Sequence, residues 1–118
     1  MIIYASTGLG KTTYCKTHYN CCDADYYIYQ HSNYTSYYDY VSDMNKVYKI
    51  VFINHIEDID LSMIDQVYLA ESFDMIVNRV TTREEHRFIP NKETFDKERE
   101  IFPNAIILKK NQYLSDVL

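Results

Sequence analysis

Apolar positions along the chain fall either in short continuous runs or at spacings of three and four residues. The continuous runs predict strands at residues 2–5, 21–24, 49–55, 66–70 and 105–108. The spaced positions predict helices over residues 11–18, 37–48, 73–80 and 92–102, and a short helix through residues 113–117. Strands that alternate with helices indicate an α/β fold. We expect a parallel sheet with helices on both faces and ligands at the carboxyl ends of the strands.

Composition narrows the class of protein. A chain of 118 residues, 47% apolar and 25% charged, is typical of one globular domain, here residues 1–118. No stretch approaches the roughly 20 apolar residues that span a bilayer, and the start MIIYAS lacks the basic and long apolar regions of a signal peptide. We therefore expect a cytoplasmic protein without a membrane partner. Three cysteines, two of them adjacent at Cys21 and Cys22, favour reduced thiols over a disulfide.

Charge argues against broad binding to a nucleic-acid backbone. The net charge is -5, and proteins that bind phosphate backbones usually carry a basic face. Residues 1–78 hold 4 Lys and Arg against 10 Asp and Glu, whereas residues 79–118 hold 8 against 7. We therefore expect the basic residues that act in binding to form local groups and not a broad basic face.

Both glycines of the chain lie between the first predicted strand and the first predicted helix, in Ala5-Ser-Thr-Gly-Leu-Gly-Lys-Thr12. This run fits the P-loop pattern of Gly, four residues, then Gly-Lys-Ser/Thr, with alanine at the first position. In such a loop, successive N–H groups point at phosphate oxygens, and glycine permits the backbone torsions and the close approach that this requires. The alternative is a chance turn, but the flanking strand and helix favour the phosphate loop. We call residues 5–13 the glycine loop.

The motif predicts a role for most residues of the glycine loop. Lys11 is expected to neutralise the β- and γ-phosphates of ATP, Thr12 to offer its hydroxyl to Mg²⁺, and Thr13 to reach the α-phosphate. The nucleotide-binding residues are then Ser6, Thr7, Gly8, Leu9, Gly10, Lys11, Thr12 and Thr13.

Two carboxylates follow the second predicted strand. Asp23 and Asp25 are two residues apart, so both can face one site if this segment is extended. One would hold Mg²⁺ and the other would accept a proton from an attacking hydroxyl; we assign these roles to Asp23 and Asp25. The alternative is that both aspartates only form a turn.

Three arginines recur at spacings of four. Arg79, Arg83 and Arg87 form one cationic stripe if the helix that begins near residue 73 continues. Guanidinium groups bind phosphate oxygens in pairs, so Arg79 and Arg83 are candidates to clamp the transferring phosphate. The alternative is a solvated helix face that pairs with Glu84 and Glu85.

The third predicted strand ends without an acid. Asn54 and His55 stand where P-loop proteins usually place an aspartate that holds magnesium. Glu57 and Asp58 follow closely and are candidates to replace it, although a polar end to an ordinary strand is an equal alternative. We expect His55 to be a neutral hydrogen-bond donor.

Tyrosines are concentrated in residues 26–48, which contain 8 of the 13 in the chain. Aromatic rings there could stack on a base of an acceptor or contact a protein partner. For most of them we expect a simpler role, which is to pack a short helix onto the sheet with their hydroxyls at the surface.

The glycine loop, the Asp23 and Asp25 pair, the arginines and the C-terminal Tyr113-Leu-Ser-Asp116 together resemble small phage-encoded P-loop proteins of the nucleotide-kinase (adenylate-kinase-like) group. The resemblance spans most of the chain and implies a P-loop NTPase fold with sheet order 2-3-1-4-5, a short lid near residues 79–90, and phosphoryl transfer from ATP with Mg²⁺. The acceptor would be a nucleotide, a nucleoside or a polynucleotide end. The alternative is a P-loop module without catalysis that binds and regulates a host protein through residues 26–48.

Overall fold

Five parallel strands form the centre of the molecule. The computed structural model describes residues 1–81 and 90–118. The strands are β1 (Ile2–Ala5), β2 (Cys21–Asp23), β3 (Ile50–Ile53), β4 (Gln66–Ala70) and β5 (Ile106–Leu108). They lie in the order β2-β3-β1-β4-β5, and each neighbouring pair is parallel. The α/β class and the sheet order 2-3-1-4-5 are therefore confirmed.

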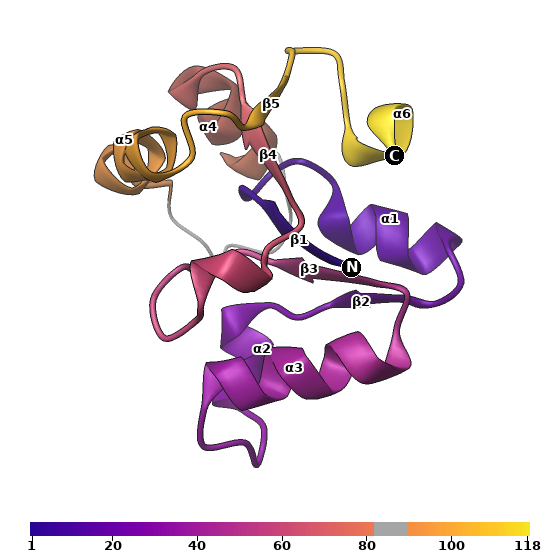
Figure 1. The fold of residues 1–118 in the computed structure, drawn as a ribbon. Coiled ribbons are helices and arrows are strands. Elements are labelled where there is room, and N and C mark those ends of the chain that lie inside the picture. The colour runs from indigo at the N-terminus through magenta and orange to yellow at the C-terminus, as the bar shows by residue number, and fades with distance from the viewer. Residues whose placement is uncertain (82–89) are drawn as a thin grey trace.

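Helices cover both faces of this sheet. They are α1 (Lys11–Thr17), α2 (Tyr26–Gln30), α3 (Tyr37–Val47), α4 (Phe73–Thr81), α5 (Lys92–Ile101) and α6 (Leu114–Val117), with a 3-10 turn, η1, at Leu61–Met63. Figure 1 shows α2 and α3 on one side of the sheet and α1 and α6 on the other. None of the helices within residues 1–81 and 90–118 is long and apolar enough to cross a membrane.

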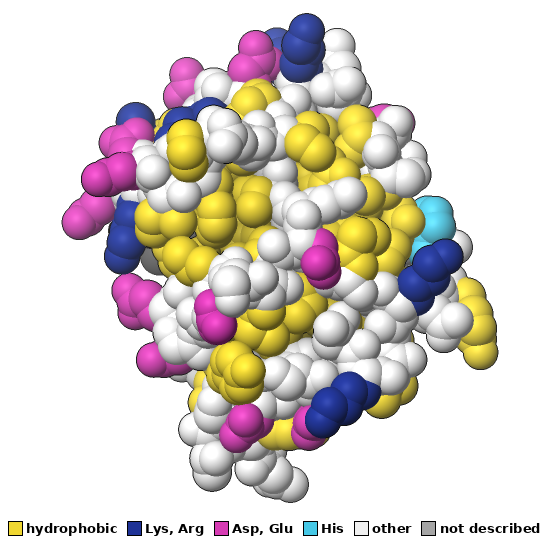
Figure 2. All heavy atoms as spheres, in the orientation of Figure 1, with side chains coloured by type: hydrophobic (Ala, Val, Ile, Leu, Met, Phe, Trp, Pro, Cys, Tyr) yellow, Lys and Arg dark blue, Asp and Glu magenta, His cyan; other side chains and the backbone are white. Residues whose placement is uncertain are grey.

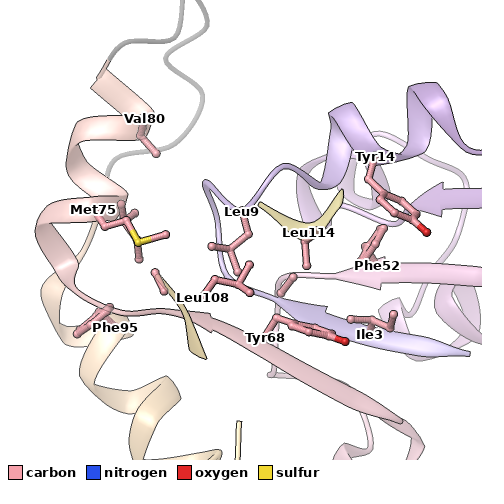
Figure 3. Close-up of a cluster of buried hydrophobic side chains, with 13 residues drawn as sticks. Ile3, Leu9, Tyr14, Phe52, Tyr68, Met75, Val80, Phe95, Leu108 and Leu114 are labelled. Atoms are coloured by element: carbon pink, nitrogen blue, oxygen red, sulfur yellow. The ribbon is translucent and has the colours of Figure 1, made fainter. Parts of the chain in front are cut away.

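Alternate residues of β1 divide the apolar core into two clusters. Ile3 and Ala5 face α1, α4 and α6, and Figure 3 shows Leu9 of the glycine loop pointing into this cluster beside Leu108 and Leu114. Ile2 and Tyr4 face α3 on the other side. This two-sided burial explains why the inner strands read as continuous apolar runs.

The strand register gathers the polar ends of three strands at one edge of the sheet. Tyr4 of β1 lies opposite Ile53 of β3, and Asp23 of β2 lies opposite Phe52 of β3. The glycine loop follows β1 and Asn54 follows β3, while Asp23 is the last residue of β2. The carboxyl edge of the sheet is therefore the place to look for a site.

The cysteines differ from the expectation. Cys15, near the end of α1, and Cys21, at the start of β2, form a disulfide with Cα atoms 5.0 Å apart, while Cys22 keeps a free thiol. The prediction of reduced thiols is therefore wrong for Cys15 and Cys21. The tight connection between α1 and β2 brings these two residues together, and the sequence spacing alone does not reveal it.

Candidate functional site

The glycine loop is held from both ends. The N–H of Ser6 donates to the carbonyl of Tyr68 on β4 at 3.2 Å, and the carbonyl of Leu9 accepts from the N–H of Leu114 at 3.0 Å. The Leu9 side chain is fully buried in the core. These contacts fix the loop to β4, to α6 and to the apolar core.

Both glycines adopt conformations that other residues resist. Gly8 has φ of 89° and Gly10 has φ of 92°, in the left-handed region. A Cβ at Gly10 would also lie 3.2 Å from Cδ1 of Tyr113, closer than most real contacts. Gly10 therefore cannot be replaced without moving either the loop or Tyr113.

Lys11 is buried at the mouth of the glycine loop. Its Nζ donates to the carbonyl of Ala5 at 2.8 Å, so the ammonium group folds back across the loop. A cation in this position neutralises anionic oxygens held inside the loop.

Thr12 and Asp23 form the pair expected at a magnesium site. The Thr12 hydroxyl donates to Oδ2 of Asp23 at 2.9 Å, and Oδ1 of Asp23 is buried without a partner among the described residues. A hydroxyl and a carboxylate with a free oxygen fit the oxygen ligands and bound waters that Mg²⁺ prefers. Within residues 1–81 and 90–118 there is no cluster of three His, Cys, Asp or Glu side chains that would hold a metal alone. Phosphate oxygens would therefore have to supply much of the coordination.

Asp25 is fixed by two hydrogen bonds. It caps the start of α2, where Oδ1 accepts from the N–H of Tyr27 at 2.7 Å, and Oδ2 accepts from Nδ2 of Asn54 at 3.1 Å. The amide oxygen of Asn54 in turn accepts from the N–H of Tyr26 at 3.2 Å. The turn-forming alternative therefore describes part of what Asp25 does, and the same contacts hold its carboxylate still.

These groups line one cavity of about 480 Å³. Its lining comes from the glycine loop, the segment after β2, the end of β3 and the end of α4: Thr7, Gly8, Lys11, Thr12, Asp23, Asp25, Tyr26, Tyr27, Ile28, Gln30, Asn54, His55 and Val80. The expectation that Asp23 and Asp25 face one space beside the loop is confirmed. Its volume lies within the range of about 300–1,000 Å³ that is usual for small-molecule sites.

His55 forms part of the cavity wall. Its ring stacks on Tyr26 with centroids 3.7 Å apart, and its Nε2 is buried without a partner among the described residues. Burial lowers the pKa of His55, although the nearby carboxylates of Glu57 and Asp58 oppose this shift. A neutral imidazole is consistent with the expected hydrogen-bonding role.

Arg79 contacts backbone carbonyls in this structure. Its guanidinium donates to the carbonyl of Gly8 at 3.0 Å, of Lys110 at 2.9 Å and of Gln112 at 2.7 Å, and it lies 3.8 Å from the ring centre of Tyr113. These contacts join α4 to the glycine loop and to the segment before α6. At least three of its five N–H donors are therefore engaged by backbone carbonyls. Arg83 and Arg87 lie outside the described residues, as does most of the predicted lid.

The other acids predicted near β3 do not enter the cavity. Glu57 is exposed and pairs with Lys97 at 3.7 Å, and Asp58 is exposed in a turn with φ of 59°. A buried acid that the sequence did not single out lies on α5 instead. Glu98 of α5 is 5% exposed, and its Oε2 accepts from the hydroxyl of Tyr4 on β1. An acidic residue three positions after Phe95, on the apolar face of a helix, is the signal that would have found it.

The tyrosine-rich segment packs mostly inward. Tyr37 and Tyr40 are buried, and the Tyr37 hydroxyl donates to the carbonyl of Ala24 at 2.6 Å. Tyr26, Tyr29 and Tyr34 pack against the same cluster, whereas Tyr27 and Tyr38 are about half exposed. The expectation that most of these rings pack a helix on the sheet is confirmed, but the Tyr37 hydroxyl is buried rather than at the surface.

Comparison with known proteins finds no family model that matches the chain and no curated protein that matches it.

Proposed function

We propose that this chain binds Mg·ATP on the glycine loop and transfers the γ-phosphoryl group to a hydroxyl of a nucleotide, a nucleoside or a polynucleotide end. The P-loop NTPase fold and the short lid belong to this proposal. The observation that carries it is the shared cavity, which Thr7, Gly8, Lys11 and Thr12 line together with Asp23 and Asp25. Phosphate-binding groups and a candidate base therefore open onto one space.

Each group has a distinct task in the proposed reaction. The loop backbone and Lys11 bind the phosphates and stabilise the negative charge that develops on them. Thr12 and Asp23 would hold Mg²⁺, which when bound would neutralise negative charge on the triphosphate. Asp25, held by Asn54, accepts the proton of the attacking hydroxyl.

The charge distribution favours a small acceptor or a strand end over a long stretch of nucleic acid. On the face drawn in Figure 2, the described Lys and Arg side chains are dispersed among Asp and Glu and form no continuous basic surface. The net charge of -5 agrees with this. The regulatory-module alternative gains less support, since most tyrosines of residues 26–48 are turned inward.

A transfer screen tests the proposal. Purified protein is incubated with γ-labelled ATP and Mg²⁺ together with nucleosides, nucleoside monophosphates or oligonucleotides that carry a 5′-hydroxyl, and labelled products are separated by chromatography. We expect labelled product from one acceptor class, lost in Lys11→Ala and in Asp25→Asn. Asp96→Asn, which changes an exposed carboxylate on α5, is the matched control and should keep the activity. Tight binding of ATP without transfer to any of the three classes would contradict the phosphotransferase.

A further inference from the structure

A second, smaller cavity lies beside the one described above. It measures about 30 Å³ and is lined by polar residues of the glycine loop, β3 and α5 together with the rings of Tyr4, Phe73 and Phe95. Thr7 and Asn54 line both cavities. A phosphate held against Thr7 in the large cavity would therefore lie next to the content of the small one.

One buried polar group in the small cavity needs a further partner. Ser6 is 4% exposed, and its hydroxyl has no hydrogen-bond partner among the described residues. Leaving such a group unsatisfied costs about 1–3 kcal/mol. The buried carboxylate of Glu98 lines the same cavity, and its Oε2 accepts a hydrogen bond from the hydroxyl of Tyr4.

A water molecule in the small cavity would satisfy the Ser6 hydroxyl. The cavity is larger than the roughly 10–15 Å³ that one water requires, and Ser6, Asn54, Thr94 and Glu98 around it supply the two to four polar partners that a buried water needs. A water held there would lie beside a carboxylate and next to the glycine loop.

We propose that Glu98 activates this water and that the chain hydrolyses a bound nucleoside triphosphate to the diphosphate and inorganic phosphate. The proposal rests on the proposed function, because it requires the triphosphate to occupy the glycine loop. Glu98 would be a second proton acceptor at the γ-phosphate, reaching the site from α5 rather than from the end of β3, where Asn54 stands in place of an acid.

The step is a displacement at phosphorus. The water oxygen forms a bond to the γ-phosphorus while its proton passes to the Glu98 carboxylate. The bond between the γ-phosphorus and the oxygen that bridges it to the β-phosphate breaks, and its electron pair leaves on the nucleoside diphosphate. Proton transfer to a positioned carboxylate typically contributes about 10²–10⁴-fold to such a rate.

Tyr4 is a positioning residue in this proposal. Burial raises the pKa of Glu98, while the Tyr4 hydrogen bond and the nearby charges of Lys11 on α1 and Arg99 on α5 lower it. Removing the Tyr4 hydroxyl should therefore raise the pKa of Glu98 and shift the pH at which Glu98 becomes a base upward.

The test measures phosphate release from Mg·ATP and, separately, ATP affinity by calorimetry. For Glu98→Gln, which keeps an acceptor for Tyr4, we expect hydrolysis to fall about 10²-fold or more with ATP affinity within about threefold of wild type. Glu100→Gln, an exposed change on the same helix, should leave both unchanged. In Tyr4→Phe, the pH at which the rate of phosphate release begins to rise should move to higher pH. If Glu98→Gln does not fold, this shift tests the role of Glu98 in its place.

Each outcome separates the two proposals. If wild-type protein binds ATP but releases no phosphate, the role of Glu98 is overturned and nucleotide binding stands. The same conclusion follows if folded Glu98→Gln hydrolyses ATP at the wild-type rate. An unshifted pH dependence in Tyr4→Phe also overturns the role of Glu98. Failure of wild-type protein to bind ATP overturns the proposed function itself.

Discussion

Replacing Arg79 tests whether this arginine stabilises the glycine loop or clamps phosphate. Two of its hydrogen bonds, to Gly8 and Gln112, are part-buried, and we count about 1 kcal/mol for each because water can replace them partly. The contact with the Tyr113 ring adds about 0.5–1 kcal/mol. Arg79→Ala should therefore lower the free energy of unfolding by about 2–3 kcal/mol. For a domain of this size, that lowers Tm by roughly 10 °C.

The same substitution should weaken Mg·ATP binding, since Gly8 loses the contact that fixes its carbonyl. Thermal unfolding and calorimetry measure the two effects. Arg99→Ala is the matched control: Arg99 donates to the carbonyl of Ala70 and stacks 4.3 Å from the ring centre of Phe95, away from the glycine loop. Because neither of these contacts is to the glycine loop, Arg99→Ala should lose comparable stability without a specific loss of ATP affinity. If Arg79→Ala keeps the wild-type Tm and ATP affinity while phosphate transfer slows, the reasoning from the carbonyl contacts is wrong and the clamp is right.

Three further predictions concern the acids and the disulfide. Asp25→Asn should reduce phosphate transfer by about 10²–10⁴-fold with ATP affinity within a few-fold, because asparagine still caps α2 but accepts no proton; an unchanged transfer rate in steady-state assays would remove Asp25 as the base. Burial raises the pKa of Glu98 above its value in the unfolded chain, so the folded state loses stability as the pH rises from the unfolded pKa through the folded pKa. Glu98→Gln has no such group, so its Tm should rise relative to that of wild type across this pH range. A difference in Tm that does not change with pH would contradict this prediction. Thiol titration of unfolded, unreduced protein should find one thiol, and three thiols would contradict the pairing of Cys15 with Cys21. Reduction of this disulfide should lower the free energy of unfolding by about 2 kcal/mol, because the loop that it closes is short.

Much of the architecture follows from local pattern. The bounds of β1 and β4 agree with the sequence to the residue, and β3 is found because its apolar run is continuous. The gathering of the glycine loop and Asp23 at one edge also follows, because parallel strands end together. The helix α2 was missed, since five residues with three tyrosines carry little helical signal. Asp25 as its N-cap was the available clue.

Contacts between distant segments could not be read in the same way. The spacing of Arg79 places it on a helix face, but the carbonyls that it binds at Lys110 and Gln112 are more than 30 residues away. The spacing from Phe95 likewise places Glu98 on the apolar face of a helix, but only the fold shows that α5 lies against Tyr4 and Ser6. The type and spacing of a residue predict what its side chain can bind. Which residue it contacts depends on how distant segments pack together.

Nucleotide binding by the glycine loop is tested most directly by titrating Mg·ATP into wild-type protein and into Lys11→Ala in a calorimeter. Lys11 is 8% exposed and lines the large cavity, so its loss removes a charge-assisted contact worth about 1.5–3 kcal/mol, or roughly ten- to a hundredfold in Kd. Lys16→Ala, an exposed change in the last turn of α1, should bind as wild type does. We predict binding by wild type that weakens by this factor in Lys11→Ala. Equal affinity of wild type and a folded Lys11→Ala for Mg·ATP would contradict the account.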